Sequence, residues 1–362
     1  MSRPSNSRVS PFVAEPVTTA SFSSRGARFH IVFSIMSIAP TALLDSKQRV
    51  IRVVARELLA KVREKSENLG IDEDRDAIHG FRVALRRLRS WIRAFNDELA
   101  ATVSPKVQRR LKRIAGATRT SRDCEVHINW LDRFAKSQRG RYGKAAEWLL
   151  DDLRAQKAEA DLELRETVNK RLERTASQLA HGLSHFIVNL DEPADPMAFA
   201  LATLIRDHAI AASNCLSKVA SVGDRAEAHD ARIAVKRLRY IVEPLGGTID
   251  DADALVDDLS KLQDELGALH DAQIFGSEIA RHLAKVLAAS TPVARTDAPT
   301  DDEQVSTASD RADALRAISQ RLHREEVRAF KSLGEKWLSG GADDLWLRAD
   351  NIASALESKR PS

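Results

Sequence analysis

The sequence predicts an all-α fold made of two pseudo-symmetric helical bundles that arose from an internal duplication. The composition favours helices, because Ala, Leu, Arg, Glu and Asp dominate while the 362 residues include only 15 Gly and 11 Pro. From about residue 43 onward, apolar residues recur at helical spacing and do not alternate as in strands. A basic helical sequence also occurs twice, 150 positions apart. A hydrophobic content of 43% over this length predicts a globular protein with a substantial core.

The first 36 residues predict a leader outside the folded domain. They are rich in Ser, Arg and Pro and end in a short apolar run, 29–36. This run is too short to cross a bilayer, and no convincing small-residue cleavage site follows it. We therefore expect 1–36 to be disordered, or spurious if translation starts at Met36, rather than an export signal.

The two cysteines indicate a reducing compartment. Cys124 and Cys215 are not part of a CxxC motif and have no neighbouring ligand pair. We expect no disulfide framework, no metal site and no cofactor, and we expect the protein to be cytoplasmic.

The main domain is expected over 43–357, as a succession of helices. Pro105 and Pro196 each follow a capping Ser or Asp and mark helix starts, whereas Gly70 and Gly246 mark helix ends. A polar, acidic stretch at 289–309 predicts a disordered insertion. The expected helices cover about 43–68, 73–99, 105–117, 122–136, 143–190, 196–220, 225–245, 253–266, 270–287, 310–336 and 342–357.

The internal repeat defines the organisation of this domain. The segment His79–Arg93 returns as His229–Glu243, with the same pattern of His, cations and apolar residues. A second block follows each copy at an offset of 148, and it matches Arg113 with Lys261, Arg122 with His270, and Asp123 with Asp271. Two matched blocks in the same order predict repeat one at about 43–195 and repeat two at about 196–357.

Each repeated helix is amphipathic, with its cations on one side. At 100° per residue, the cations and the leading histidine fall within an arc of about 80°. The opposite arc is apolar and predicts a buried face, which fixes the direction of the basic face. The candidate binding residues on the basic faces are His79, Arg82, Arg86, Arg89 and Arg93 in the first copy and His229, Arg232, Lys236 and Arg239 in the second.

The basic faces predict binding to a linear polyanion. The first copy has five arginines and no acid between residues 79 and 96, and the segment 106–122 is again basic without an acid. A solvated helix normally places carboxylates four residues from its cations to relieve their repulsion. Arginine suits phosphate because its planar guanidinium donates paired hydrogen bonds. We also expect Arg113 and Lys261 to contribute.

The duplicated histidines and aspartates have several interpretations. We expect His79 and His229 to donate to phosphate oxygens, although a structural role or a metal remains an alternative. No second His, Asp or Glu stands three or four residues after His79, so no metal site is expected there. Asp123 and Asp271 are expected to be N-caps or partners of a nearby Arg, rather than catalytic carboxylates.

The paired motifs His-x-x-Arg-x-x-x-[Arg/Lys]-Arg-Leu-Arg, with Arg122-Asp123 and the segment 261–271, resemble the conserved histidine α-helical domain family, known as CHAD. The resemblance covers nearly the whole chain. It implies two related helical bundles around a basic surface, binding of inorganic polyphosphate and association with polyphosphate granules. Glu243 departs from the pattern, because it stands where the first copy has the cation Arg93. Many relatives carry a fused triphosphatase domain, whose glutamate pattern is missing here.

We therefore expect a non-enzymatic polyphosphate-binding protein. The sequence has no GxxxxGK[ST], GxGxxG, GxSxG or HExxH motif. Nucleic acid is the alternative polyanion, but aromatic residues make up only 5% and none lies within the basic arcs to stack on bases. A metal-dependent phosphohydrolase is the other alternative. No membrane partner is expected, and the oligomeric state stays open.

Overall fold

The computed structural model describes residues 37–70, 75–137, 141–185, 195–290 and 302–359, and the statements below concern these residues. The expected leader, 1–36, lies outside them. The domain 37–362 is one compact unit.

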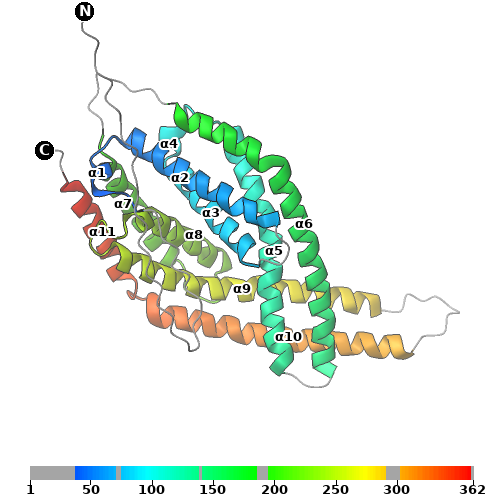
Figure 1. Cartoon of the computed structure of the whole chain (residues 1–362). Helices are drawn as coiled ribbons and strands as arrows, with labels where there is room; N and C mark the ends of the chain where they lie inside the picture. The colour runs from blue at the N-terminus through cyan, green and yellow to red at the C-terminus, as the bar shows by residue number, and fades with distance from the viewer. Residues whose placement is uncertain (1–36, 71–74, 138–140, 186–194, 291–301, 360–362) are drawn as a thin grey trace, which may run out of the picture. The chain divides into compact units, whose positions relative to one another are not determined.

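The described residues fold into helices without a strand, which confirms the all-α fold (Figure 1). No helix among them is both long and apolar enough to span a membrane. The helices are α1 (Pro40–Leu43), α2 (Lys47–Glu67), α3 (Arg75–Ala94), α4 (Asn96–Leu99), α5 (Pro105–Ser137), α6 (Arg141–Ser184), α7 (Met197–Leu216), α8 (Arg225–Val242), α9 (Ala252–Ser290), α10 (Asp302–Trp337) and α11 (Asp343–Glu357), with 3-10 turns at Asn68–Gly70 and Glu243–Leu245.

Two expected helix breaks are wrong. The sequence predicted separate helices at 105–117 and 122–136, and at 253–266 and 270–287, but α5 and α9 run through both gaps. Gly116 and Gly267 lie inside these helices. A glycine costs a helix interior only about 1 kcal/mol, and the long packing of α5 on α6 and of α9 on α10 outweighs that cost.

Both ends of the expected disordered insertion at 289–309 are helical. Helix α9 extends to Ser290 and α10 already begins at Asp302, so helices reach into both ends of the range. Residues 291–301 lie outside the described part of the chain.

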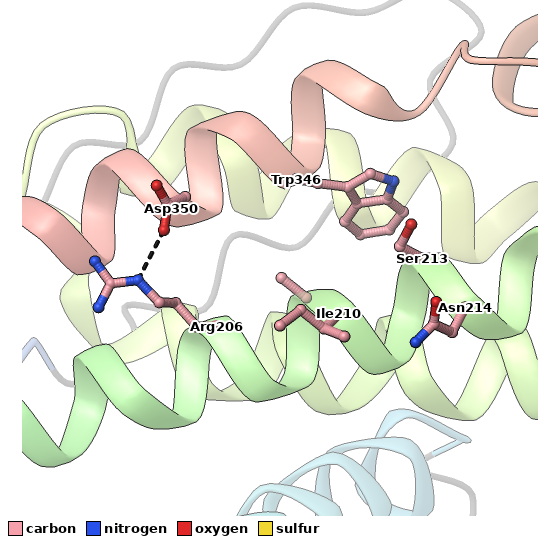
Figure 2. A pocket seen from close by; sticks show the side chains of 7 residues that line it. Arg206, Ile210, Ser213, Asn214, Trp346 and Asp350 are labelled. Atoms are coloured by element: carbon pink, nitrogen blue, oxygen red, sulfur yellow. Dashed lines mark hydrogen bonds and ion pairs between the residues drawn. The ribbon is translucent and has the colours of Figure 1, made fainter.

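The two halves have parallel helix orders. In repeat one, α2 packs on α3, α3 on α5 and α5 on α6; in repeat two, α7 packs on α8, α8 on α9 and α9 on α10. Helix α6 is continuous, whereas its counterpart is divided into α10 and α11. Ser339 and Gly340, both with positive φ, make this break. It turns the chain so that α11 packs along α7 (Figure 2).

A reciprocal contact joins the starts of the two repeats. The backbone N–H of Lys47 donates to the carbonyl of Asp195, and the N–H of Met197 donates to the carbonyl of Asp45, both at 2.9 Å. The two bonds exchange places when each residue is shifted by 150 positions. Such reciprocity is typical of a two-fold contact between equivalent units and agrees with the predicted duplication.

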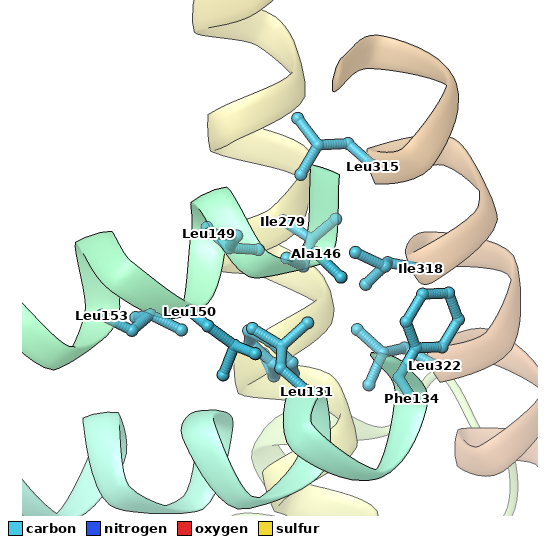
Figure 3. Packing of buried hydrophobic residues seen from close by; sticks show 11 residues of the cluster. Leu131, Phe134, Ala146, Leu149, Leu150, Leu153, Ile279, Leu315, Ile318 and Leu322 are labelled. Carbon is cyan, nitrogen blue, oxygen red and sulfur yellow. The ribbon is translucent and has the colours of Figure 1, made fainter. Parts of the chain in front are cut away.

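The long helices α5, α6, α9 and α10 of the two repeats share a hydrophobic cluster (Figure 3). Leu131 and Phe134 of α5 and Leu149 of α6 pack with Ile279 of α9 and Ile318 of α10. The repeats are therefore joined through a common core, which limits their movement relative to each other.

The apolar arcs of the repeated helices are buried, as predicted. In repeat one these residues are Phe81, Ala84, Leu85, Leu88, Trp91, Ile92 and Phe95, and in repeat two they are Ala231, Ala234, Val235, Leu238, Ile241, Val242 and Leu245. Burying one large apolar side chain contributes about 1.5–3 kcal/mol. Rotation of α3 or α8 about its axis would expose several of these residues, so the directions of the opposite faces are fixed.

Candidate functional site

The cations of four helices converge where α3 packs against α8. Helix α5 lies against α3, and α9 lies against α8, so each repeat contributes two helices. The residues whose charges act on one another here form what we call the cationic cluster. They are His79, Arg82, Arg86, Arg89 and Arg93 of α3, Arg119 and Arg122 of α5, His229, Arg232, Lys236 and Arg237 of α8, and His270 of α9.

Lys236 lies among the cations of both repeats. Burial, followed by the charges of nearby arginines, lowers the pKa of its ammonium group to about 8. Arg232 and Arg237 are on its own helix, whereas Arg86 and Arg93 come from α3. The two basic faces predicted from the sequence are thus brought together.

The histidines of the cluster are poor proton acceptors in the free protein. Burial is the largest cause of the lowered pKa values of His79 and His229, followed by Arg82 and Arg232 respectively. The pKa of His270 falls to about 4, mainly through burial and then through Arg232. The rings of His229 and His270 lie 5.0 Å apart between centroids.

Three carboxylates, two on α5 and one on α9, neutralise part of the cluster. Glu125 lies 3.7 Å from Arg82 and 3.1 Å from Arg122, and Asp123 lies 3.6 Å from Arg119. The third is Asp271, whose carboxyl pKa is raised by burial, against the opposing effect of Arg122 and Arg232.

These positions correct two expectations. Asp123 and Asp271 lie inside α5 and α9, so the N-cap interpretation is wrong, and they are partners of arginines. Arg82 was expected on an exposed face, but it is only 8% exposed, and burial lowers its pKa to about 10. The packing of α5 on α3 and the ion pair with Glu125 account for this burial.

Much of the cluster has no counter-charge. Among the described carboxylates, none forms an ion pair with Arg86, Arg89, Arg93 or Lys236. Arg89 and Arg93 have lowered pKa values, chiefly because of burial. Desolvated cations that repel one another destabilise the free protein, and a bound anion would relieve this cost.

Three sequence-predicted residues are not among the charges that act within the cluster. Arg113 is exposed on α5. Lys261 is paired with Asp258 at 2.6 Å, which raises the pKa of its ammonium group. Arg239 is half-buried, with its guanidinium over the ring of the buried Tyr240 at 4.8 Å.

Sequence reasoning did not include Arg119, Arg122, Arg237 and His270 among the site residues. The signal was present, because Arg122 and His270 are a matched pair of the second repeated block. Their assignment to helix starts concealed it. In an unbroken α5, Arg119 and Arg122 continue the basic face toward the repeated helices, and His270 holds the matched position in α9.

The exception in the pattern, Glu243, has a structural role. It is 6% exposed and accepts hydrogen bonds from Arg87 Nη2 at 2.5 Å and Nε at 3.3 Å. This bidentate ion pair links α3 to the end of α8. Glu243 therefore fixes the repeats together and is not an interruption in the cationic cluster.

One hollow outside the cluster contains an arginine but lacks this electrostatic character. A pocket of about 330 Å³ between α7 and α11 contains Arg206, but Asp350 and Glu357 both pair with it (Figure 2). Within the described ranges, no group of three or more His, Cys, Asp or Glu side chains is placed to hold a metal ion.

Comparison with known proteins agrees with this architecture. The CHAD domain family matches residues 53–280. The fold is similar to the crystal structure of the CHAD domain from the plant Ricinus communis, with a TM-score of 0.60 and 17% identity over 92% of this chain and 98% of that one. It is also similar to PptA from Streptomyces chartreusis, with a TM-score of 0.52 and 18% identity over 83% and 100% of the two chains. No curated protein sequence matches the chain. Because the family match extends over more than half of the sequence and the fold agrees, this chain belongs to the CHAD domain family.

Proposed function

We propose that this protein binds inorganic polyphosphate, without catalysis, through the cationic cluster. One observation carries the proposal: cations from both repeats lower one another's pKa values while Arg86, Arg93 and Lys236 have no described carboxylate partner. A fold retains such repulsion at a cost in stability. A linear anion that contacts both repeats offsets that cost.

Polyphosphate fits the chemistry of the cluster. Its internal phosphates each have one negative charge and expose oxygens that accept paired hydrogen bonds from a guanidinium. The cations follow a helix whose residues 82–93 span about 16 Å, so an extended ligand reaches more of them than a single phosphate does. We further propose that the protein associates with polyphosphate granules in the cytoplasm.

Nucleic acid is the competing ligand, because any phosphate backbone is attracted to such a surface. Tyr240, the aromatic residue next to Arg239, is buried and cannot stack on a base. Displacement of labelled polyphosphate distinguishes the two ligands. Unlabelled polyphosphate should compete far better than single-stranded DNA or RNA at equal phosphate concentration. The reverse order would contradict the proposal.

The same titration at different salt concentrations tests the electrostatic origin of binding. If about six cations contact phosphates, the slope of log K against log salt should be about −4. An affinity that does not change between about 50 and 200 mM salt would exclude ion-pair binding.

A phosphohydrolase is the second alternative. Incubation with polyphosphate and Mg²⁺ or Mn²⁺, followed by measurement of released phosphate, tests it directly. We expect no release above that of a protein-free control. Sustained release that depends on the protein would replace the binding function with an enzymatic one.

A further inference from the structure

A basic pocket that shares two arginines with the cationic cluster lies between α3 and the start of α5. It has a volume of about 260 Å³ and is lined by Arg89 and Arg93 of α3 and by Arg109 and Lys112 of α5. No acidic residue lines this pocket. Arg89 is half-buried, and its pKa is lowered by burial and then by the charge of Arg93. The pocket therefore gathers four cations around one hollow.

Arg93 connects this pocket to the cationic cluster. Its own pKa is lowered by burial and by Arg237, and its charge lowers the pKa of Lys236. A ligand that leaves the cluster along α3 therefore meets positive charge continuously until it reaches Arg109 and Lys112.

The equivalent end of repeat two has a different charge. At the offsets that relate the repeats, Arg93 corresponds to Glu243, Arg109 to Asp257, and Lys112 to Ser260. The neighbouring Asp258 is paired with Lys261 and with Arg348, at 2.6 and 2.7 Å. Repeat two is thus acidic and internally neutralised where repeat one is basic.

We propose that the pocket between α3 and α5 is a second phosphate subsite. A long polyphosphate chain bound in the cationic cluster reaches this pocket, whereas a short chain does not extend from the cluster to the pocket. The proposal rests on the proposed function. A chain bound in the cluster holds its next phosphates near the pocket at a high effective concentration, so the second contact adds strongly to affinity. The bound chain therefore extends from the cluster over repeat one and not over repeat two.

The test compares tripolyphosphate with long-chain polyphosphate by calorimetric titration. In the variant Arg109→Glu with Lys112→Glu, we expect affinity for the long chain to fall at least tenfold. The ratio of long-chain to tripolyphosphate affinity should fall with it. Both side chains are exposed, so the helix content and melting temperature should match the wild type.

The matched control is Arg324→Glu with Arg328→Glu, which makes the same charge change on exposed residues of α10. It should keep the wild-type ratio. An unchanged ratio in the pocket variant, or an equal loss in the control, would overturn the subsite. If the wild type binds neither ligand, the proposed function itself fails. If Arg86→Glu abolishes binding while the pocket variant binds as the wild type does, only the subsite is wrong.

Discussion

Repeat one and repeat two have the same helix order and the same buried faces, but they use equivalent positions for different purposes. Arg87 of α3 pairs with the buried Glu243 of repeat two. At the offset of 150, the equivalent pair is Arg237 with Arg93, and these two cations repel each other. One side of the crossing between α3 and α8 is therefore an ion pair that stabilises the fold, and the other side remains free for an anion.

The comparison shows how two halves with the same helix order can differ in charge. The apolar faces must remain alike, because both pack against the same kind of partner helix. Polar residues at the crossing are less constrained, so Glu243 could replace a cation without disturbing the core. The ion pair with Arg87 stabilises the contact between the repeats, while Arg93 and Arg237 keep the positive charge that the proposed ligand would contact.

The variants with the largest expected effect test whether both repeats contact the same ligand. We expect Arg86→Glu and Lys236→Glu, tested separately, each to weaken polyphosphate binding by at least about 1.5 kcal/mol, or more than tenfold. Each change removes an attraction and adds a repulsion. Fluorescence anisotropy with labelled polyphosphate measures the loss.

The control for both variants is Arg324→Glu on α10, which changes the net charge equally at an exposed position. It should bind nearly as tightly as the wild type. If only one of the two cluster variants lost affinity, the ligand would contact one repeat and not both.

A second prediction concerns the ion pair that divides the two sides. Glu243→Gln should lower the free energy of unfolding by about 2–3 kcal/mol, because Arg87 then loses a buried counter-charge. Urea denaturation measures this change. A loss below about 0.5 kcal/mol would show that the pair contributes little.

The mirror variant Arg93→Glu gives the opposite result on the other side of the crossing. It places a carboxylate near Arg237, so stability should rise slightly while polyphosphate affinity falls. An unchanged affinity would contradict the assignment of Arg93 to the ligand side, and a fall in stability would contradict its repulsion by Arg237.

A smaller effect comes from protonation. The pKa values of His79, His229 and His270 are lowered in the free protein, and bound phosphates favour the imidazolium form. The complex then holds more protons than the free protein, so affinity should rise as pH falls below about 7. The free protein itself should lose stability below about pH 6.5, because the unfolded chain binds these protons more readily.

The alkaline side depends on Lys236, whose pKa is about 8 in the free protein. Affinity should fall above that pH and should not fall in Lys236→Arg, which stays charged. Replacing the three histidines with Gln should remove the rise at low pH. Polyphosphate titrations between about pH 5.5 and 9 measure the changes in affinity at low and at high pH. If these variants keep the wild-type pH dependence, other groups take up and release the protons.

The sequence predicted the parts of this site that depend on periodicity. The buried faces of α3 and α8 followed from apolar spacing, and the candidate cations followed from the opposite arc. It did not predict the burial of Arg82 or the position of His270, because both depend on how α5 and α9 pack across the repeated helices. The role of Glu243 was also hidden, since its partner Arg87 lies 156 residues away.

Thermal unfolding with and without polyphosphate tests the central claim, that uncompensated cations from both repeats destabilise the free protein and bind the polyanion. For the wild type, the melting temperature should rise with polyphosphate concentration, as linkage requires. The variant Arg86→Gln with Lys236→Gln should melt at a higher temperature than the wild type without ligand, because it lacks two repelling, desolvated charges. Its further rise with polyphosphate should be small. If this variant melted lower without ligand and kept the full rise with polyphosphate, the cationic cluster would neither destabilise the free protein nor bind the polyanion.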